Sequence, residues 1–273
     1  MNPLSQSLVI GPFALSVGQL LLALSFGVAL IVGALAGRRS GVPTADTLFT
    51  VILVAAAGAR LVFVVRYWGS YDGVLPMLDI RDGGFDPWGG LIAGTGYALW
   101  ALWRSPSRRM VLGGALLTGA LTYTLTAVPL ILIEDHSRSL PDTALTTLDG
   151  EPVTLPGIAE EKARPLVVNL WATWCPPCRR EMPAFELAQR EEQDVVFIFV
   201  NQGEDALTIR RFLEQESLAL DNILLDPHNA LGRATGARAV PTTLYYDAEG
   251  RLVDTHFGEV SRATLQRGLD RLR

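Results

Sequence analysis

Long apolar segments dominate the first 133 residues, and they restrict the possible folds more than any other feature of the chain. Segment 110–133 contains no charged residue and too few polar ones to form the polar face of a soluble helix. We therefore expect a bundle of about four transmembrane helices rather than buried helices of a soluble protein. The four segments are residues 16–36, 47–65, 89–103 and 110–133. The third is short, and a re-entrant or interfacial helix is an alternative for it.

The distribution of arginines predicts how these segments are oriented. Arg38 and Arg39 follow the first segment, and three more arginines follow the third. The loop 68–88 between the second and third segments is instead acidic. Because arginine-rich loops stay in the cytoplasm, both ends of the bundle should lie outside it. The N-terminus lacks the basic region of a cleavable signal, so we expect a multi-pass protein of the bacterial inner membrane.

Charge also divides the chain into two parts. The formal net charge is −5, yet arginines outnumber carboxylates before residue 134, so the acidity belongs to the second half. Nothing is basic enough to suggest a nucleic-acid partner. We expect a transmembrane helical domain over residues 1–137 and an extracytoplasmic domain over residues 138–273.

The only two cysteines stand in one short motif that follows the apolar run 166–171. The motif consists of Trp174, Cys175, Pro176, Pro177 and Cys178. A strand that leads into a helix here would place the sulfur of Cys175 at the positive end of the helix, which favours the thiolate. The pattern therefore indicates thiol-disulfide chemistry, with Cys175 attacking and Cys178 resolving.

Two other interpretations of the motif are weaker. A zinc site needs four ligands, and the remaining candidates, His136, His228 and His256, are not at zinc spacing. A purely structural disulfide across so short a loop would restrict the unfolded chain little. We therefore expect no metal and no cofactor other than a redox-active Cys175–Cys178 disulfide.

The flanking sequence has the strand-motif-helix order that such a site requires. Residues 195–200 and 242–246 are predicted strands, and residues 205–216 are a predicted helix. Residues 247–250 have the composition of a turn.

Residues from about 140 to 273 resemble the thioredoxin fold, and more narrowly the membrane-tethered TlpA/ResA-like thiol-disulfide oxidoreductases. The matching stretches are 148–150 (LDG), 168–183 (VNLWATWCPPCRREMP) and 240–243 (VPTT). The resemblance implies an α/β thioredoxin-fold domain in which Pro241 is cis and faces the dithiol. It also implies that the backbone of Val240 pairs with a bound client, and that Trp174, Pro176 and Pro177 belong to the client-binding surface.

The source of a proton acceptor for Cys178 is not evident from the sequence. Many thioredoxins carry a buried acid in the strand before the motif, but Asn169 stands there and cannot exchange a proton near neutral pH. Glu181 is three residues beyond Cys178, and we interpret it as a surface charge. Water or another carboxylate must then accept the proton.

Both cysteines are used by the motif, so the membrane segments cannot pass electrons by thiol exchange. The resemblance implies a separate thiol-relay membrane protein of the DsbD/CcdA kind as partner, with disulfide-containing proteins outside the cytoplasm as clients and cytochrome c biogenesis among the candidate pathways. Pro176 and Pro177 offer the thiolate no donor and no charge. We therefore favour a reductase of protein disulfides over an oxidase.

Arg60 lies within the second apolar segment, where an unpaired charge costs at least ~2.5 kcal/mol. It needs a partner, a water-filled cavity or a lipid headgroup. Small residues at 90 and 94, and at 115 and 119, predict close contacts between helices.

A second resemblance covers about residues 10–103. Residues 58–61 (GARL) and 82–94 (DGGFDPWGGLIAG) are similar to the N-terminal part of prolipoprotein diacylglyceryl transferase. In that family a histidine directly precedes Gly-Gly-Leu, whereas Trp88 stands there in this chain. Indole cannot accept a proton, so we expect the fold without the transferase reaction.

Two functions therefore remain. One is a membrane-anchored thiol-disulfide oxidoreductase, whose membrane half is an anchor, a docking surface or a lipid-binding domain. The alternative is a lipid-handling or lipoprotein-processing protein with an accessory thioredoxin domain, in which Arg60 binds a lipid headgroup.

Overall fold

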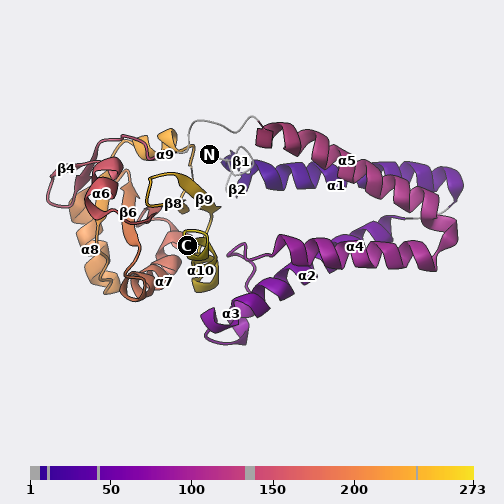
Figure 1. The fold of residues 1–273 in the computed structure, drawn as a ribbon, viewed down its shortest axis with the longest axis horizontal. Coiled ribbons are helices and arrows are strands. Elements are labelled where there is room, and N and C mark those ends of the chain that lie inside the picture. The colour runs from indigo at the N-terminus through magenta and orange to yellow at the C-terminus, as the bar shows by residue number, and fades with distance from the viewer. Residues whose placement is uncertain (1–6, 11–12, 42–43, 133–138, 238) are drawn as a thin grey trace. The chain divides into compact units, whose positions relative to one another are not determined.

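A computed structural model describes residues 7–10, 13–41, 44–132, 139–237 and 239–273 (Figure 1). It divides into two compact units. One contains residues 18–69 and 84–133, and the other contains residues 134–273 with Ser70–Gly83 and the described part of the segment before Gly18. The predicted domain boundary between residues 137 and 138 lies outside the described residues.

The first unit is helical, as predicted. Its long helices are α1 (Val17–Ser40), α2 (Ala45–Arg66), α4 (Pro87–Arg104) and α5 (Arg109–Leu132). Three stretches within the described helices, Val17–Arg39, Ala45–Arg66 and Pro106–Leu130, are long and apolar enough to cross a membrane. Helix α4, which contains several Gly and Trp residues and ends in Arg104, is not one of them.

Small residues bring these helices close together, α2 beside α4 and α1 beside α5 (Figure 1). A Cβ built at Gly94 in α4 would lie 2.9 Å from the Cβ of Ala55 in α2. A Cβ built at Gly119 in α5 would lie 3.0 Å from the Cβ of Ala29 in α1. The predicted close contacts at both small-residue patterns are thus confirmed.

The second unit is built on a sheet of seven described strands in the order β4-β3-β7-β6-β5-β8-β9. The strands are β3 (Leu145–Thr147), β4 (Pro152–Val153), β5 (Leu166–Trp171), β6 (Val196–Gln202), β7 (Ile223–Asp226), β8 (Thr242–Tyr246) and β9 (Leu252–Phe257). Strands β5, β6 and β7 are parallel, and the remaining pairs are antiparallel. The shorter elements are β1 (Ser7–Ile10), β2 (Phe13–Ser16), η2 (Trp68–Ser70), α3 (Val74–Leu78) and η3 (Pro106–Arg108).

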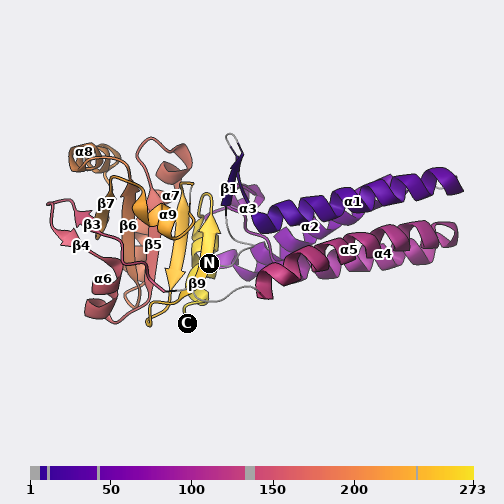
Figure 2. The ribbon, with the colours of Figure 1, turned by 90° about the horizontal axis from the view of Figure 1, so that it is seen from above.

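Helices cover both faces of this sheet. They are α6 (Leu155–Lys162), α7 (Pro176–Glu191), α8 (Ala206–Glu216), α9 (Ala230–Ala234) and α10 (Arg262–Asp270). One hydrophobic core joins the sheet to α7, α8 and α10, and the other joins it to α6 and α9. Figure 2 shows the strands side by side, from β3 and β7 through β6 and β5 to β9. This α/β arrangement confirms the predicted fold class, including the two strands and the helix expected after the motif.

Strand β5 is buried on both faces, and its side chains alternate between the two cores. Leu166, Val168 and Leu170 belong to the core beneath α6 and α9. Val167 and Trp171 belong to the core beneath α7. Asn169 lies between these two and therefore faces α7, the helix that follows the motif.

Candidate functional site

The two cysteines form a disulfide at the start of α7, with their Cα atoms 5.3 Å apart. Cys175 is the N-cap of the helix, and Pro176 and Pro177 occupy its first turn. This placement has a local cause, because proline is tolerated where a helix has no partner for its backbone N–H groups. The Sγ atom of Cys175 accepts a hydrogen bond from the backbone N–H of Cys178 at 3.3 Å. The sulfur thus lies at the positive end of the helix, as the sequence predicted.

The arginines after the motif are paired with carboxylates of other elements. Arg179 pairs with Glu216, and Arg180 donates from Nε to Glu259 at 2.9 Å. Both pairs are partly exposed, so they stabilise the fold little. In each pair the carboxylate offsets the charge of the arginine.

The peptide bond between Val240 and Pro241 is cis, which confirms the geometry expected from the family. Pro241 directly precedes β8, the antiparallel neighbour of β5. Val240 packs against the hydrophobic core that contains both cysteines. These two residues therefore lie just before β8, near the end of β5 that leads to the dithiol.

Glu181 is buried beside the dithiol, with 1 % of its surface exposed. Its carboxylate accepts hydrogen bonds from the Asn169 side chain at 2.9 Å and from the backbone N–H of Val260 at 2.9 Å. Burial raises the pKa of the Glu181 carboxyl from 4.5 to about 8, although both hydrogen bonds act in the opposite direction. The carboxyl is therefore mostly protonated at neutral pH.

The interpretation of Glu181 as a surface charge is wrong. The buried residues of α7 include Cys178, Glu181, Met182 and Phe185, which follow the three-to-four-residue spacing of one helix face. Because Cys178 and Glu181 are three residues apart on that face, they are neighbours. The signal was present in the sequence, since the phase of the apolar residues already places Glu181 on the buried side.

The remaining residues of the motif form its exposed surface. Trp174 is 67 % exposed and Pro176 is also exposed, whereas Pro177 is half-buried. Of the two cysteines, Cys175 is 3 % exposed and Cys178 is fully buried. Cys175 is therefore the more accessible of the two, by a small margin.

Arg60 has a polar partner within the helical unit. Its Nη1 atom donates to the backbone carbonyl of Gly84 at 2.8 Å, and its guanidinium lies 5.7 Å from the centre of the Phe63 ring. Gly84 is required at this place, because a Cβ there would lie 2.5 Å from Arg60 Nη1. The expected need for a partner is therefore met by the loop that precedes α4.

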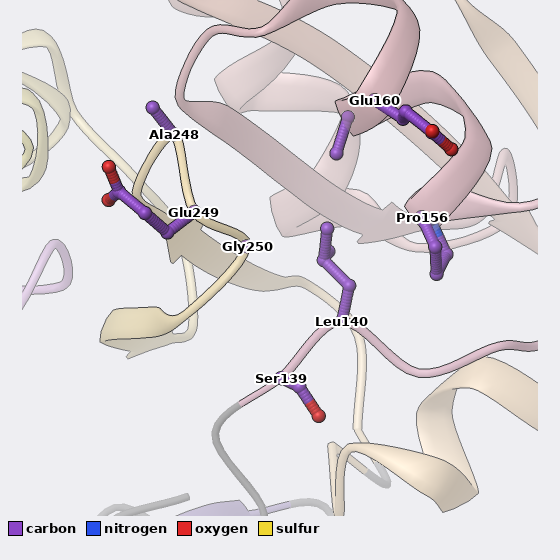
Figure 3. Close-up of a pocket in the computed structure, with 8 residues that line it drawn as sticks. Ser139, Leu140, Pro156, Glu160, Ala248, Glu249 and Gly250 are labelled. Atoms are coloured by element: carbon purple, nitrogen blue, oxygen red, sulfur yellow. The ribbon is translucent and has the colours of Figure 1, made fainter.

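A cavity of about 330 Å³ lies away from the dithiol (Figure 3). It is bounded by α6, by the turn 247–250 and by Leu140. Tyr246, which precedes this turn, pairs with Leu166 at the start of β5, whereas the dithiol follows the end of β5. The cavity is thus at the opposite end of β5 from the dithiol and is not part of the redox site.

Within the described parts of the chain, no group of three or more His, Cys, Asp or Glu side chains could hold a metal ion. His256 is buried, and burial lowers its pKa to about 4. His136 lies outside the described residues.

Comparisons with known proteins agree with this division of the chain. A family model described as redoxin matches residues 136–269, and one described as prolipoprotein diacylglyceryl transferase matches residues 6–125. The thioredoxin-like protein YneN of Bacillus subtilis is 32 % identical over 139 residues, which are 50 % of this chain and 79 % of YneN.

The thiol-disulfide oxidoreductase ResA of Halalkalibacterium halodurans is 34 % identical over 124 residues, which are 45 % of this chain and 68 % of that protein. A solved structure of a putative thiol:disulfide interchange protein DsbE from Chlorobium tepidum aligns with a TM-score of 0.45 and 23 % identity, over 51 % of this chain and 99 % of that one. With its dithiol at the start of α7 and its cis-proline before β8, the chain belongs to the ResA/TlpA-like thiol-disulfide oxidoreductases, here fused to a membrane domain similar to prolipoprotein diacylglyceryl transferase.

Proposed function

We propose that this thiol-disulfide oxidoreductase is a membrane-anchored reductase that acts on protein disulfides outside the cytoplasm. The observation that carries the proposal is the surroundings of the dithiol. Among the described residues, the backbone N–H of Cys178 is the one donor to the Cys175 sulfur, and the neighbouring arginines are paired with carboxylates. A thiolate with so little stabilisation belongs to a reducing couple.

In the proposed reaction, the Cys175 thiolate attacks one sulfur of a client disulfide. The other client sulfur leaves as a thiolate and takes up a proton. The Cys178 thiolate then attacks the Cys175 sulfur, and the second client sulfur leaves in the same way. Two electrons pass from the dithiol to the client, and the Cys175–Cys178 disulfide remains.

We propose Glu181 as the proton acceptor for Cys178, acting through the fraction of the carboxyl that is ionised at neutral pH. A thiol has an ordinary pKa of about 8.5, so a carboxyl with a pKa of about 8 can exchange a proton with it at little cost. The observed disulfide form fits the reverse step as well. When a reductant attacks the disulfide, Cys178 leaves as a thiolate, and the protonated Glu181 can supply its proton.

The client would bind across Trp174, Pro176, Pro177, Val240 and Pro241. An extended client strand can pair with backbone groups outside the sheet ladder, and we propose that Val240, which precedes β8, offers them. The exposed Trp174 provides apolar contact area next to the attacking sulfur.

A separate membrane protein of the DsbD/CcdA kind would re-reduce the disulfide. Cys175 and Cys178 are the only cysteines in the sequence, so the electrons cannot come through thiols of the chain's own membrane half. The membrane half is then an anchor. A lipid headgroup near Arg60 remains a secondary proposal, since a buried guanidinium suits a phosphate.

The extracytoplasmic position of the redox domain is supported by the loop between α2 and α4. Ser70–Gly83 belongs to the same compact unit as the redox domain, and Asp82 accepts a hydrogen bond from Ser261 at 2.7 Å. Because the loop and the redox domain belong to one compact unit, we expect both to lie on the same side of the membrane. The positive-inside rule independently assigns that side to the outside.

The attacking role of Cys175 is tested by trapping. In Cys178→Ser the resolving step is absent, so mixed disulfides with client proteins should accumulate on Cys175 and disappear on addition of dithiothreitol. Non-reducing electrophoresis and mass spectrometry measure them. In the matched variant Cys175→Ser, trapping should be at least about tenfold weaker, because Cys178 is fully buried. Equal trapping through Cys178 would overturn the assignment.

The role of Glu181 is tested with Glu181→Gln. We expect the attack of Cys178 on a mixed disulfide at Cys175 to slow by about tenfold or more at pH 7, because an amide cannot accept the proton. The difference should narrow as the pH rises, because hydroxide can then take up the proton in place of the carboxyl. The two-step release of thionitrobenzoate from dithionitrobenzoate measures both reactions. Glu191→Gln, at the exposed end of α7, is the control, and an unchanged second step in Glu181→Gln would contradict the role.

The direction of the reaction is tested with Pro177→His. An imidazole between the cysteines would stabilise the thiolate and so raise the reduction potential by about 30 mV or more, a tenfold or larger change in the equilibrium with glutathione. Pro177→Ala adds a backbone N–H without a charge, so it should raise the reduction potential less than Pro177→His does. A wild-type potential already as high as about −120 mV, the value of a strong oxidant, would refute the reductase proposal.

The topology is tested by labelling single cysteines in a chain whose native cysteines are replaced. Positions 70 and 139 should react with a membrane-impermeant maleimide from outside the cell, and position 107 only after the membrane is opened. Each replaced residue is a serine, so the change in volume is small. Labelling of position 139 only from the cytoplasm would overturn both the topology and the compartment of the dithiol.

A further inference from the structure

The loop between β5 and α7 is held by a carboxylate from a different part of the sheet. Glu204 accepts two hydrogen bonds from Thr173, one from the backbone N–H at 2.7 Å and one from the hydroxyl at 2.5 Å. The side-chain amide of Asn201 donates to the same carboxylate at 2.8 Å. Hydrogen bonds to an ionised carboxylate are stronger than those between neutral groups.

Glu204 is itself anchored to a rigid element. Its backbone N–H donates to the Asn201 side chain at 3.3 Å, and Asn201 is a fully buried residue of β6. Between them Gly203 has a φ of +86°, a conformation that glycine adopts without strain. Asn201 pairs with Trp171 in the sheet, so Glu204 connects the ends of two neighbouring strands.

The residue that Glu204 holds is two positions before the attacking cysteine. The backbone N–H of Cys175 donates to the carbonyl of Ala172 at 3.2 Å, which closes a turn around Thr173 and Trp174. Trp174 is mostly exposed and gives this turn little packing. The contacts of Thr173 with Glu204 are therefore well placed to fix the turn and, through it, the position of the Cys175 sulfur.

We propose that Glu204 is a positioning residue for the dithiol, acting through Thr173. The proposal rests on the proposed chemistry of Cys175 and Cys178. While the turn is fixed, the Cys175 sulfur stays within reach of Cys178, so the second step of the exchange, attack by Cys178 on a mixed disulfide, is intramolecular and fast. Loss of the contacts frees about one residue of backbone in the reduced state and disfavours closure of the disulfide by about tenfold.

The negative charge of Glu204, like its contacts with Thr173, makes the couple more reducing. A carboxylate near the turn disfavours the thiolate of Cys175, and a thiolate that is less stable makes the couple more reducing. Loss of the charge in Glu204→Gln therefore adds to the loss of the contacts. Thr173→Val removes one contact and no charge, so the two variants separate the contributions.

The experiment measures the equilibrium of the full-length chain, in detergent, with reduced and oxidised glutathione. The exchange converts the protein dithiol and one glutathione disulfide into the protein disulfide and two glutathione thiols. In Thr173→Val the equilibrium constant for disulfide formation should fall about tenfold, equivalent to about 30 mV, and in Glu204→Gln it should fall further because the charge is lost as well. The second release of thionitrobenzoate should slow relative to the first. Thr173→Ser keeps the hydroxyl and should restore wild-type behaviour.

The controls distinguish positioning from a loss of stability. Glu214→Gln removes an exposed carboxylate of α8. It should change neither the equilibrium constant with glutathione nor the rate of the second thionitrobenzoate release. Wild-type values in both test variants, or an equal shift in Glu214→Gln, would overturn the proposal. Failure of Thr173→Ser to restore the wild-type values would also overturn it.

If Glu204→Gln does not fold, Thr173→Val carries the test. If the wild-type chain does not exchange with glutathione at all, the proposed function itself is contradicted, which is a separate result.

Discussion

The redox domain depends on the burial of β5 on both faces. Alternate side chains of a strand point to opposite sides, so each residue of β5 is assigned to one of two cores. The single polar side chain of this strand, Asn169, falls on the side of α7. Its amide donates to Glu181 and also to the hydroxyl of Thr243 in β8. The strand therefore delivers the chain to Cys175 and also supplies the support for the buried carboxyl beside Cys178.

Much of the site could be predicted from sequence because its signals are local. The strand, the motif and the first turn of α7 are contiguous, and the residue types of each suit its position. The helical phase of α7 also indicates the burial of Glu181, although its charge favours the surface. Burial of a carboxyl is costly, and the hydrogen bonds that offset the cost come from Asn169 and Val260, which are distant in sequence.

Glu204 shows a different limit of prediction from sequence. It lies 31 residues from Thr173, and only the pairing of β5 with β6 brings the two together.

In the membrane half, the small-residue patterns predicted the close helix contacts, because a missing Cβ is visible in the sequence. The partner of Arg60 was not predictable in the same way, since it is a backbone carbonyl, which every residue possesses.

The proposed proton exchange in α7 is limited by how much negative charge the buried pair Cys178 and Glu181 can hold. Cys178 and Glu181 are almost completely shielded from water, so ionising both would cost two desolvation penalties without a compensating cation. Proton transfer between them leaves the total charge of the pair unchanged. In the proposed reaction the thiolate of Cys178 therefore forms without a new buried charge. An asparagine suits the position beneath them, because its amide adds no third charge and can act as donor or acceptor toward either state of Glu181.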